Sequence, residues 1–420
     1  MKRVSAAPCR VVWLRGAAVV LATLASLVAR TASADDDKPL DPNRRELILV
    51  PDIGGSSDIG VELGLALSTS KFADGIRPYR WRMDVLASMS FKSDARGFRP
   101  VEQDHGVRLD IPHFFHPRLR LDSRISFTRY VTAPWYGVGN GTVVEDVPPP
   151  TDASSTHDYI HEEGRLRTVL RVKVEKALDL AFAGNFRIEA PEAFATSKLD
   201  RDLRAGKIIG GELTFLETVG AGVYIDTRDN EFVTKDGIFY QIGVAETVGT
   251  NEKVAYGEAS AVLSHYAKLW GPFSFASRVV GSFKFGEVPF YELHTGGVFV
   301  PQYLVGGEHG VRGVLMGRFA GLVKVITNIE LRAMPYPSIK VFNYRLRIGN
   351  TAFFDAGRVW SDYKYDSEKD GHLLGLKVGV GGGFFFQWDE SLVFRVDAAY
   401  SATNTSKFPV SFYLGTGMSF

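Results

Sequence analysis

The chain has 420 residues, a formal net charge of +1 and one cysteine, Cys9. This composition excludes an internal disulfide framework, and the near-neutral charge gives no reason to expect a nucleic-acid partner. After Ala34 no run of 18 apolar residues occurs, so no transmembrane helix is expected. Apolar residues make up 45% of the chain and mostly alternate with polar ones.

The first 34 residues have the pattern of a secretory signal peptide. A basic start at Lys2 precedes an apolar core, residues 16–29, and a small-residue cleavage site ends at Ala34. The core is about 14 residues long, shorter than the roughly 20 that a spanning helix needs, which disfavours a membrane anchor. Removal would take away five basic residues and no acids, so the net charge would change from +1 to 1 − 5 = −4. A short periplasmic tail, residues 35–44, would follow.

From residue 45 onward the chain alternates apolar and polar residues with a period of two, which indicates strands whose two faces meet different surroundings. Residues 165–175 are an example, since Leu166 and Leu170 alternate with Arg165, Arg167 and Arg171. We expect sixteen strands in the following segments: 45–54, 58–69, 79–91, 101–112, 118–131, 164–176, 178–190, 207–225, 238–249, 253–269, 273–286, 321–334, 342–356, 372–386, 391–401 and 409–420.

Strand length separates two all-β architectures. Strands of a soluble sandwich usually have five or six residues, whereas a barrel strand that crosses a bilayer needs about 9 to 11. The expected strands all have 10 residues or more and are thus long enough to cross a bilayer, so the sequence predicts an all-β protein, a transmembrane antiparallel barrel. An even strand number puts both termini in the periplasm. The four long connections, 132–163, 191–206, 287–320 and 358–371, then lie on the outer surface.

Four segments resemble motifs of one family. They are Asp226-Thr227-Arg228-Asp229-Asn230 with the later Gly237, Gly306-Gly307 with Val311-Arg312-Gly313, Asn328-Ile329-Glu330-Leu331-Arg332, and Phe353-Phe354-Asp355-Ala356-Gly357. Together and in this order they resemble the bacterial surface antigen superfamily of outer-membrane barrels, which includes BamA, TamA and FhaC. The resemblance covers residues 45–420 and implies that the first segment is a periplasmic turn. The second would be the tip of a long sixth extracellular loop that folds inward.

The resemblance places Arg312 inside the pore, and the alternation of strands puts Glu330 and Asp355 on the inner wall. A guanidinium can bind one carboxylate by two hydrogen bonds and reach another, so the three residues would pin the loop to the wall. The alternative is that Arg312 is a solvated loop residue. The same alternation predicts an arginine-rich lumen, which would hold ion pairs within the wall or attract anions or an acidic partner segment: Arg80, Arg82, Arg118, Arg120, Arg124, Arg165, Arg167, Arg171, Arg345, Arg347 and Arg395.

The last segment alternates to the end of the chain, with Phe412 and Phe420 expected on one apolar face. A strand that runs to a terminal aromatic resembles the sorting signal of outer-membrane barrels. Other sites are not expected: we find no catalytic residues, no cofactor site and no metal site. His157 and His161 have metal-like spacing but are expected in a long polar loop.

Members of the resembled family that handle polypeptides carry periplasmic polypeptide-transport-associated repeats before the barrel, and none fits in residues 35–44. The expected function is protein insertion or translocation at the outer membrane by a member that lacks these repeats. The alternatives are a solute channel, a structural or anchoring barrel, and a surface antigen whose loops bind extracellular ligands. We expect a monomer whose partners are outer-membrane lipid and the machinery that inserts barrels. A periplasmic repeat protein or a secreted polypeptide is a further candidate partner.

Overall fold

The computed structural model describes residues 41–56, 60–94, 97–250, 253–341, 344–390, 392–403 and 409–420. The predicted signal peptide and residues 35–40 of the predicted tail lie outside the described residues. Within the described part of the chain, no helix combines the length and the apolar character needed to cross a membrane.

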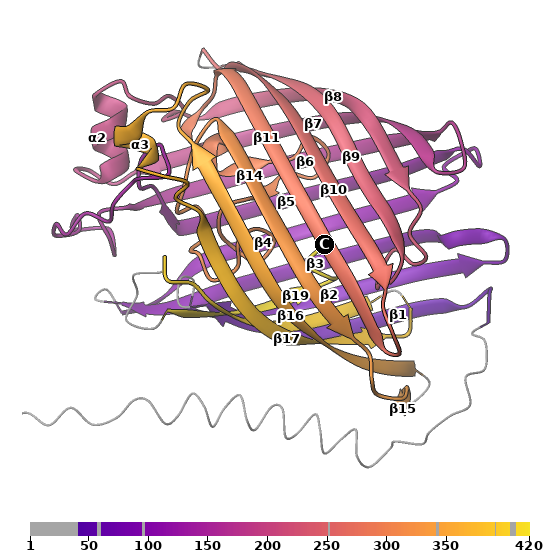
Figure 1. Cartoon of the computed structure of the whole chain (residues 1–420). Coiled ribbons are helices and arrows are strands. Elements are labelled where there is room, and N and C mark those ends of the chain that lie inside the picture. Colours follow the sequence, from indigo (N-terminus) through magenta and orange to yellow (C-terminus); the bar gives the residue numbers. More distant parts are fainter. Residues whose placement is uncertain are drawn as a thin grey trace, which may run out of the picture.

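One large antiparallel sheet of seventeen strands forms the molecule (Figure 1). Its strands pair in chain order, and their bounds are β1 Arg45–Ser56, β2 Gly60–Ala73, β3 Ile76–Asp94, β4 Gly97–Pro112, β5 Leu119–Pro134, β6 Asp158–Lys173, β7 Leu178–Ala193, β8 Thr214–Asp226, β9 Gly237–Gly249, β10 Ala255–Lys268, β11 Phe273–Glu287, β14 Val323–Ala333, β15 Ile339–Val341, β16 Tyr344–Trp360, β17 Lys377–Trp388, β18 Leu392–Tyr400 and β19 Val410–Thr416. The remaining elements are short: α2 Lys198–Arg204, η1 Phe290–His294, β12 Thr295–Gly296, β13 Gln302–Tyr303 and α3 Ser367–Asp370.

Each predicted segment overlaps one strand of the large sheet, from the 7 residues of β19 to the 19 residues of β3, and β15 is the addition. β14 and β15 both pair with β16, so they share one place in the sheet. Pro335 and Pro337 lie between them. Proline has no N–H to donate to a ladder, which explains why the strand is interrupted there.

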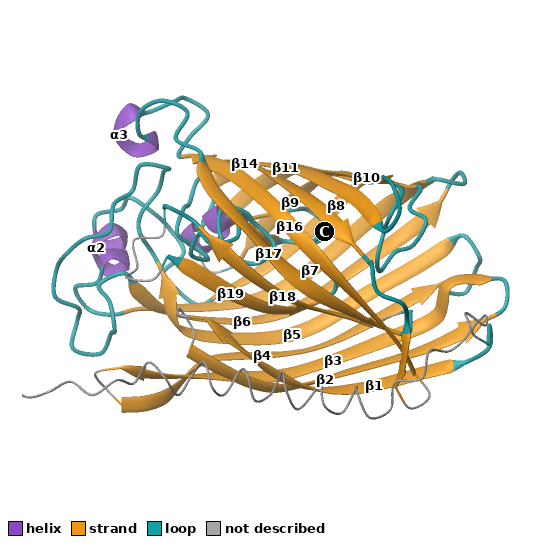
Figure 2. Cartoon of the chain, turned by 60° about the horizontal axis from the view of Figure 1, so that its bottom comes forward, coloured by secondary structure: helices purple, strands orange, loops and turns teal. Residues whose placement is uncertain are grey.

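The sheet curls strongly, so that its two end strands lie next to each other (Figures 1 and 2). Cα atoms of β1 and β19 approach within 8 Å. Among the described residues, however, no hydrogen-bonded ladder joins β1 to β19.

The polarity of the two sheet faces is the reverse of that in a soluble protein, because apolar side chains are exposed on the convex face and charged side chains are buried on the concave face. On β7, Phe182, Phe186 and Ile188 are 50%, 56% and 47% exposed on the convex face. On the concave face of the same strand, Arg187 and Glu189 are buried. Soluble proteins rarely expose such a continuous apolar surface, whereas lipid-facing barrel walls require one.

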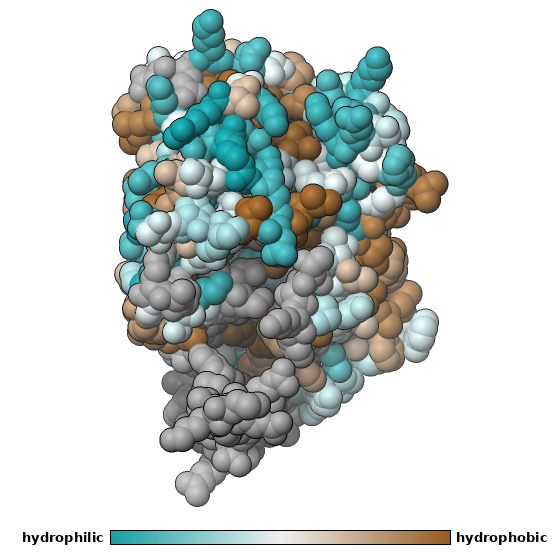
Figure 3. Space-filling model, turned by 90° about the vertical axis from the view of Figure 1, so that its left-hand side faces the viewer, coloured by the Kyte–Doolittle hydropathy of each residue, from teal (hydrophilic) through white to brown (hydrophobic). Residues whose placement is uncertain are grey.

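The two ends of the curled sheet differ. Short turns gather at one end, and α2 and α3 lie in long connections at the other (Figure 2). The long connections comprise residues 135–157, 194–213, 288–322 and 361–376, which correspond to the four that the sequence predicts. Hydrophilic side chains gather on the end that carries α2 and α3, with apolar side chains along its flanks (Figure 3). We refer to this end as the long-loop end and to the other as the short-turn end.

The prediction that Phe420 continues the apolar row of the last strand is wrong. β19 ends at Thr416, and Gly417 adopts a φ of 82°, which breaks the extended backbone. The chain then turns inward: the guanidinium carbons of Arg278 and Arg332 lie 4.9 and 5.0 Å from the centre of the Phe420 ring. Phe412, by contrast, is 53% exposed on the convex face.

Candidate functional site

The longest connection, residues 288–322, lies against the concave face of the sheet and is held at both ends. Near its start, Phe299 is buried with Val169 of β6 and Tyr224 of β8. Near its tip, Val311 packs with Ile326 of β14 and Val359 of β16. Backbone N–H groups of the loop also reach the wall, since Gly297 N donates to Glu258 Oε1 at 2.7 Å. The segment is therefore a packed part of the interior.

Arg312 is the centre of these contacts, and its side chain is 0% exposed. Its Nε and Nη2 donate to the two oxygens of Asp355 at 2.7 and 3.0 Å, and its own backbone N donates to Asp355 Oδ2 at 3.1 Å. Its Nη1 donates to Glu330 Oε1 at 2.7 Å. The structure thus brings together the three residues singled out from the sequence, in the bidentate geometry typical of strong arginine–carboxylate pairs.

A third carboxylate and an aromatic ring complete the surroundings of Arg312. Its Nη1 also donates to Asp397 Oδ2 of β18 at 3.3 Å. Its guanidinium carbon lies 3.5 Å from the centre of the Phe353 ring, a distance suited to a cation–π interaction. Asp397 was not among the residues that the sequence singled out. Its part in holding Arg312 could not be found from alternation, which assigns a face and not a partner.

The carboxylates that hold Arg312 are themselves held by the wall. Asn328 Nδ2 donates to Asp355 Oδ1 at 2.8 Å and to the carbonyl of Gly310 in the loop at 2.7 Å. Arg332 Nε donates to Glu330 Oε2 at 2.8 Å. These contacts orient both carboxylates and give the loop tip a second attachment.

Glycine is required at several points of this contact. Gly306 has a φ of 127°, and Gly307 N donates to Val314 O at 3.1 Å, which closes the turn at the loop tip. Gly313 has a φ of 88° and donates its backbone N–H to Tyr413 OH at 2.9 Å. On β17, a Cβ added to Gly379 would lie 1.7 Å from the carbonyl oxygen of Arg312. The loop backbone therefore packs directly on bare strand backbone, a use of strand glycine that is known from close backbone approaches.

The predicted periplasmic turn, residues 226–237, is organised by its own side chains. Asp226 accepts two hydrogen bonds from the Arg228 guanidinium, at 2.9 and 2.8 Å. Asp229 Oδ1 accepts from the backbone N–H of Lys235 at 2.9 Å, and Asn230 Oδ1 accepts from that of Phe232 at 2.8 Å. Gly237 has a φ of 113°. Aspartate and asparagine are favoured in turns because they can cap the backbone in this way.

This turn also extends across the short-turn end of the sheet. Glu231 accepts hydrogen bonds from both terminal nitrogens of Arg120 of β5, each at 2.9 Å. Val233 is buried with Phe385 of β17 and Val393 of β18, on another part of the wall. Burial alone would raise the pKa of Glu231, but the Arg120 guanidinium holds it below its usual value. The carboxylate is therefore ionised at neutral pH.

The two histidines with metal-like spacing lie in different surroundings. The His157 ring hydrogen-bonds to the Trp135 carbonyl oxygen at 3.0 Å, and burial lowers its pKa. His161 Nε2 lies 2.8 Å from Glu189 Oε2, and its ring nitrogen and the carboxylates of Glu163 and Glu189 are all within 4.8 Å of one another. Arg165 and Arg187 pair with Glu163 and Glu189. Both carboxylates thus already have an arginine partner, and Arg187 also pairs with Glu292 of the inner loop, residues 288–322, so this cluster belongs to an ion-pair network of the wall and the loop.

Comparisons with known proteins agree with this architecture. The Omp85 superfamily domain model matches residues 101–420. The structure is similar to that of BamA from Haemophilus ducreyi lacking POTRA domains 1–3, with a TM-score of 0.53 and 14% sequence identity over 96% of this chain and 78% of that one. It is also similar to CdiB from Escherichia coli, with a TM-score of 0.55 and 12% identity over 92% of this chain and 66% of that one. No curated protein sequence matches the chain.

Proposed function

The chain belongs to the Omp85 superfamily of outer-membrane barrel proteins, and from this premise we propose that it takes part in inserting or translocating polypeptides at the outer membrane. The observation that carries the proposal is the loop held against the inner wall by Arg312, Glu330 and Asp355. A passive channel does not need a buried three-carboxylate anchor for a loop inside its pore. A loop that is held by a few specific ion pairs is instead suited to controlled release.

The proposal includes a closed barrel. β1 and β19 would complete a wall with sixteen strand places, in which β14 and β15 count as one. An open sheet edge within lipid would leave backbone N–H and C=O groups without partners, which is why membrane sheets close. Residues 288–322 would then be the sixth connection on the outer side, folded into the lumen as a plug. Arg312, Glu330 and Asp355 would act as the lock that keeps it there.

We also propose how the chain is divided. Residues 1–34 would be a cleaved signal peptide, 35–44 a periplasmic tail and 45–420 the barrel. The role is one without catalysis and without a cofactor or metal. Its partners would be outer-membrane lipid, the machinery that inserts it, and a periplasmic repeat protein or secreted polypeptide.

A reconstitution experiment tests the function. The purified protein in liposomes should accelerate the folding of an added unfolded outer-membrane barrel severalfold over empty liposomes. A protein denatured before reconstitution serves as the control. Unchanged folding rates together with rapid uptake of small solutes would contradict the proposal and favour the solute-channel alternative. The interior cavities described below make that alternative worth testing.

A first prediction concerns the barrel itself. Unboiled protein should migrate differently from boiled protein on a denaturing gel, because a closed sheet with no free edge resists detergent. The same preparation should fractionate with the outer membrane. Recovery of the protein in the soluble periplasm, with no effect of boiling on its migration, would contradict this expectation.

A second prediction concerns the terminal aromatic as a sorting signal. Phe420→Lys should lower the amount of protein inserted in the outer membrane, and the remainder should be aggregated or degraded. Phe115→Lys is the matched control, because Phe115 is 93% exposed in a short turn. Purified Phe420→Lys protein should still refold in detergent if the residue acts in sorting. Failure to refold there would mean that the inward contacts of Phe420 with Arg278 and Arg332 are what matters.

A further inference from the structure

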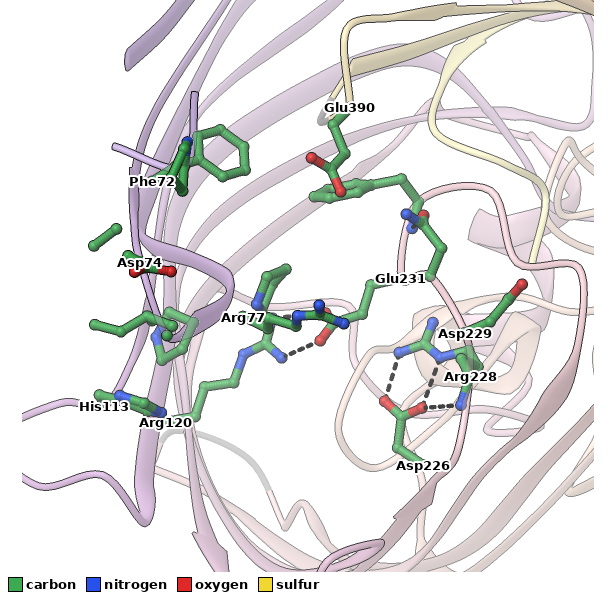
Figure 4. Close-up of a pocket in the computed structure, with 18 of the residues that line it drawn as sticks. Phe72, Asp74, Arg77, His113, Arg120, Asp226, Arg228, Asp229, Glu231 and Glu390 are labelled. Atoms are coloured by element: carbon green, nitrogen blue, oxygen red, sulfur yellow. Dashed lines mark hydrogen bonds and ion pairs between the residues drawn. The ribbon is translucent and has the colours of Figure 1, made fainter. Parts of the chain in front are cut away.

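A large cavity opens at the short-turn end of the curled sheet (Figure 4). Its volume is about 980 Å³, and its walls come from the chain before β1, from several short turns and from the first residues of β16. The turn of residues 226–237 forms one side, and Arg120 approaches Glu231 from the opposite wall (Figure 4). A cavity of this size, lined from several sides, can accommodate more than one small ion.

The lining of this cavity is rich in cations. Ten lysines and arginines and seven aspartates and glutamates contribute to it, which leaves a surplus of three positive charges. Four of the carboxylates already pair with arginines of the same cavity at 2.7 to 2.9 Å. Five cations of the lining, by contrast, form no ion pair with a carboxylate in the described part of the chain: Arg77, Arg118, Lys173, Lys176 and Arg347.

A second cavity of about 480 Å³ adjoins the first one and reaches Val300 of the inner loop. Its lining holds seven arginines and four carboxylates, again a surplus of three positive charges. The two cavities share Arg120, Arg171, Arg228, Glu231 and Phe232 in their walls. The turn of residues 226–237 therefore separates two basic compartments.

The ion pair between Arg120 and Glu231 is the junction of the two compartments. Arg120 donates to Asp110 of the wall from Nε and Nη2, at 2.9 and 2.7 Å. Arg120 also donates hydrogen bonds from Nη1 and Nη2 to Glu231, which lies in the turn. A carboxylate from outside the protein would need the same guanidinium edge, so Glu231 occupies the position of a ligand carboxylate.

We propose that the cavity at the short-turn end binds an extended acidic polypeptide segment, whose carboxylates pair with the five unpaired cations and compete with Glu231 for Arg120. An extended segment fits because these cations belong to several parts of the lining: Arg118, Lys173 and Lys176 lie at or beside the neighbouring ends of β5 and β6, whereas Arg77 is on β3 and Arg347 is on β16. The basic walls of the cavity also raise the local concentration of an anionic ligand. Displacement of Glu231 would move the turn and join the two compartments.

This inference extends the proposed function by naming an acidic segment as ligand, and it rests on that proposal only for the periplasmic orientation of the cavity. The test uses full-length folded protein in detergent and a fluorescein-labelled hexaglutamate peptide, with binding followed by anisotropy. The peptide should bind, and its affinity should fall as salt is added. Hexaglutamine and hexalysine should not bind. The assay contains no membrane and measures only peptide binding. A protein that lacks insertion or translocation activity can therefore still bind the peptide, so the two proposals can fail separately.

Variants locate the binding site. The triple change Arg118→Ala, Lys173→Ala, Lys176→Ala should weaken hexaglutamate binding by at least roughly threefold, since each exposed pair contributes modestly. The control Arg201→Ala, Arg204→Ala, Lys207→Ala removes three cations of α2 and its flank at the long-loop end and should leave the affinity unchanged. Heat-dependent gel migration verifies that both variants are folded. An unchanged affinity of the first variant, or binding of inorganic phosphate as tight as that of the peptide, would overturn the proposal.

A carboxylate variant tests the competition. Glu231→Gln should tighten hexaglutamate binding severalfold, because it removes the internal competitor for Arg120. Glu390→Gln is the matched control, because Glu390 also lines the cavity but pairs with Arg44, away from the junction. Equal effects of the two changes would show that only net charge matters and would overturn the displacement of Glu231.

Discussion

Replacing Arg312 with alanine should raise the conductance of the protein in planar bilayers and expose the loop tip to protease. The change removes the cation that Asp355, Glu330 and Asp397 share. Glu330 keeps Arg332 and Asp397 keeps Arg395, whereas Asp355 loses its one ion pair in the described part of the chain. Loss of a buried ionic partner costs about 3–5 kcal/mol, and less where water enters the pore. The loop is the part that can move, because the three carboxylates are on strands of the wall. Single-channel recording and protease mapping of residues 304–315 measure the two effects.

Arg318→Ala is the matched control for this change. Arg318 lies on the same loop and is buried, but it contacts Thr142 and the Tyr136 and Phe319 rings and pairs with no carboxylate among the described residues. It should have a much smaller effect. Because Arg312 and Asp355 share one interaction, Arg312→Ala combined with Asp355→Asn should be little worse than Arg312→Ala alone. Additive effects, or an uncut loop with unchanged conductance, would show that the ion pairs do not hold the loop.

Replacing Gly379 with alanine should release the loop by a different route. The added Cβ would lie 1.7 Å from the Arg312 carbonyl oxygen, which belongs to backbone and cannot rotate away. Either β17 or the loop must shift, so the hydrogen bonds between Arg312 and Asp355 should be strained or lost. We expect higher conductance and a lower midpoint of thermal unfolding, with a destabilisation of about 1–3 kcal/mol as for other overpacked sites.

Gly184→Ala provides the comparison for Gly379→Ala. Gly184 is also a strand glycine, on β7, and an added Cβ there would meet no atom within 4 Å. The two substitutions therefore change the backbone entropy in the same way. Only Gly379→Ala also introduces a steric clash. Equal conductance and thermal midpoints in the two variants would mean that the loop does not press on β17.

Much of the architecture follows from local sequence because the strand period is local. Side chains alternate between the two faces of any extended chain, so the buried Arg187 and Glu189 and the exposed Phe186 of β7 can be assigned without knowing their neighbours. Strand length is likewise a local property, and it indicates the thickness that the wall must span. The meeting of Arg312 with Glu330 and Asp355 was predictable only because a motif resemblance supplied the position of the loop.

Other features depended on contacts between distant parts of the chain. Asp397 joins Arg312 across 85 residues, and Glu231 reaches Arg120 across 111. The Phe420 ring leaves its expected row and meets Arg278 and Arg332 inside. Alternation assigns each of these residues to a face, but partners on the same face are chosen by the curvature of the whole sheet and by the path of the loop across it. Only the tertiary structure decides these pairings, because curvature and loop path are properties of all the strands together.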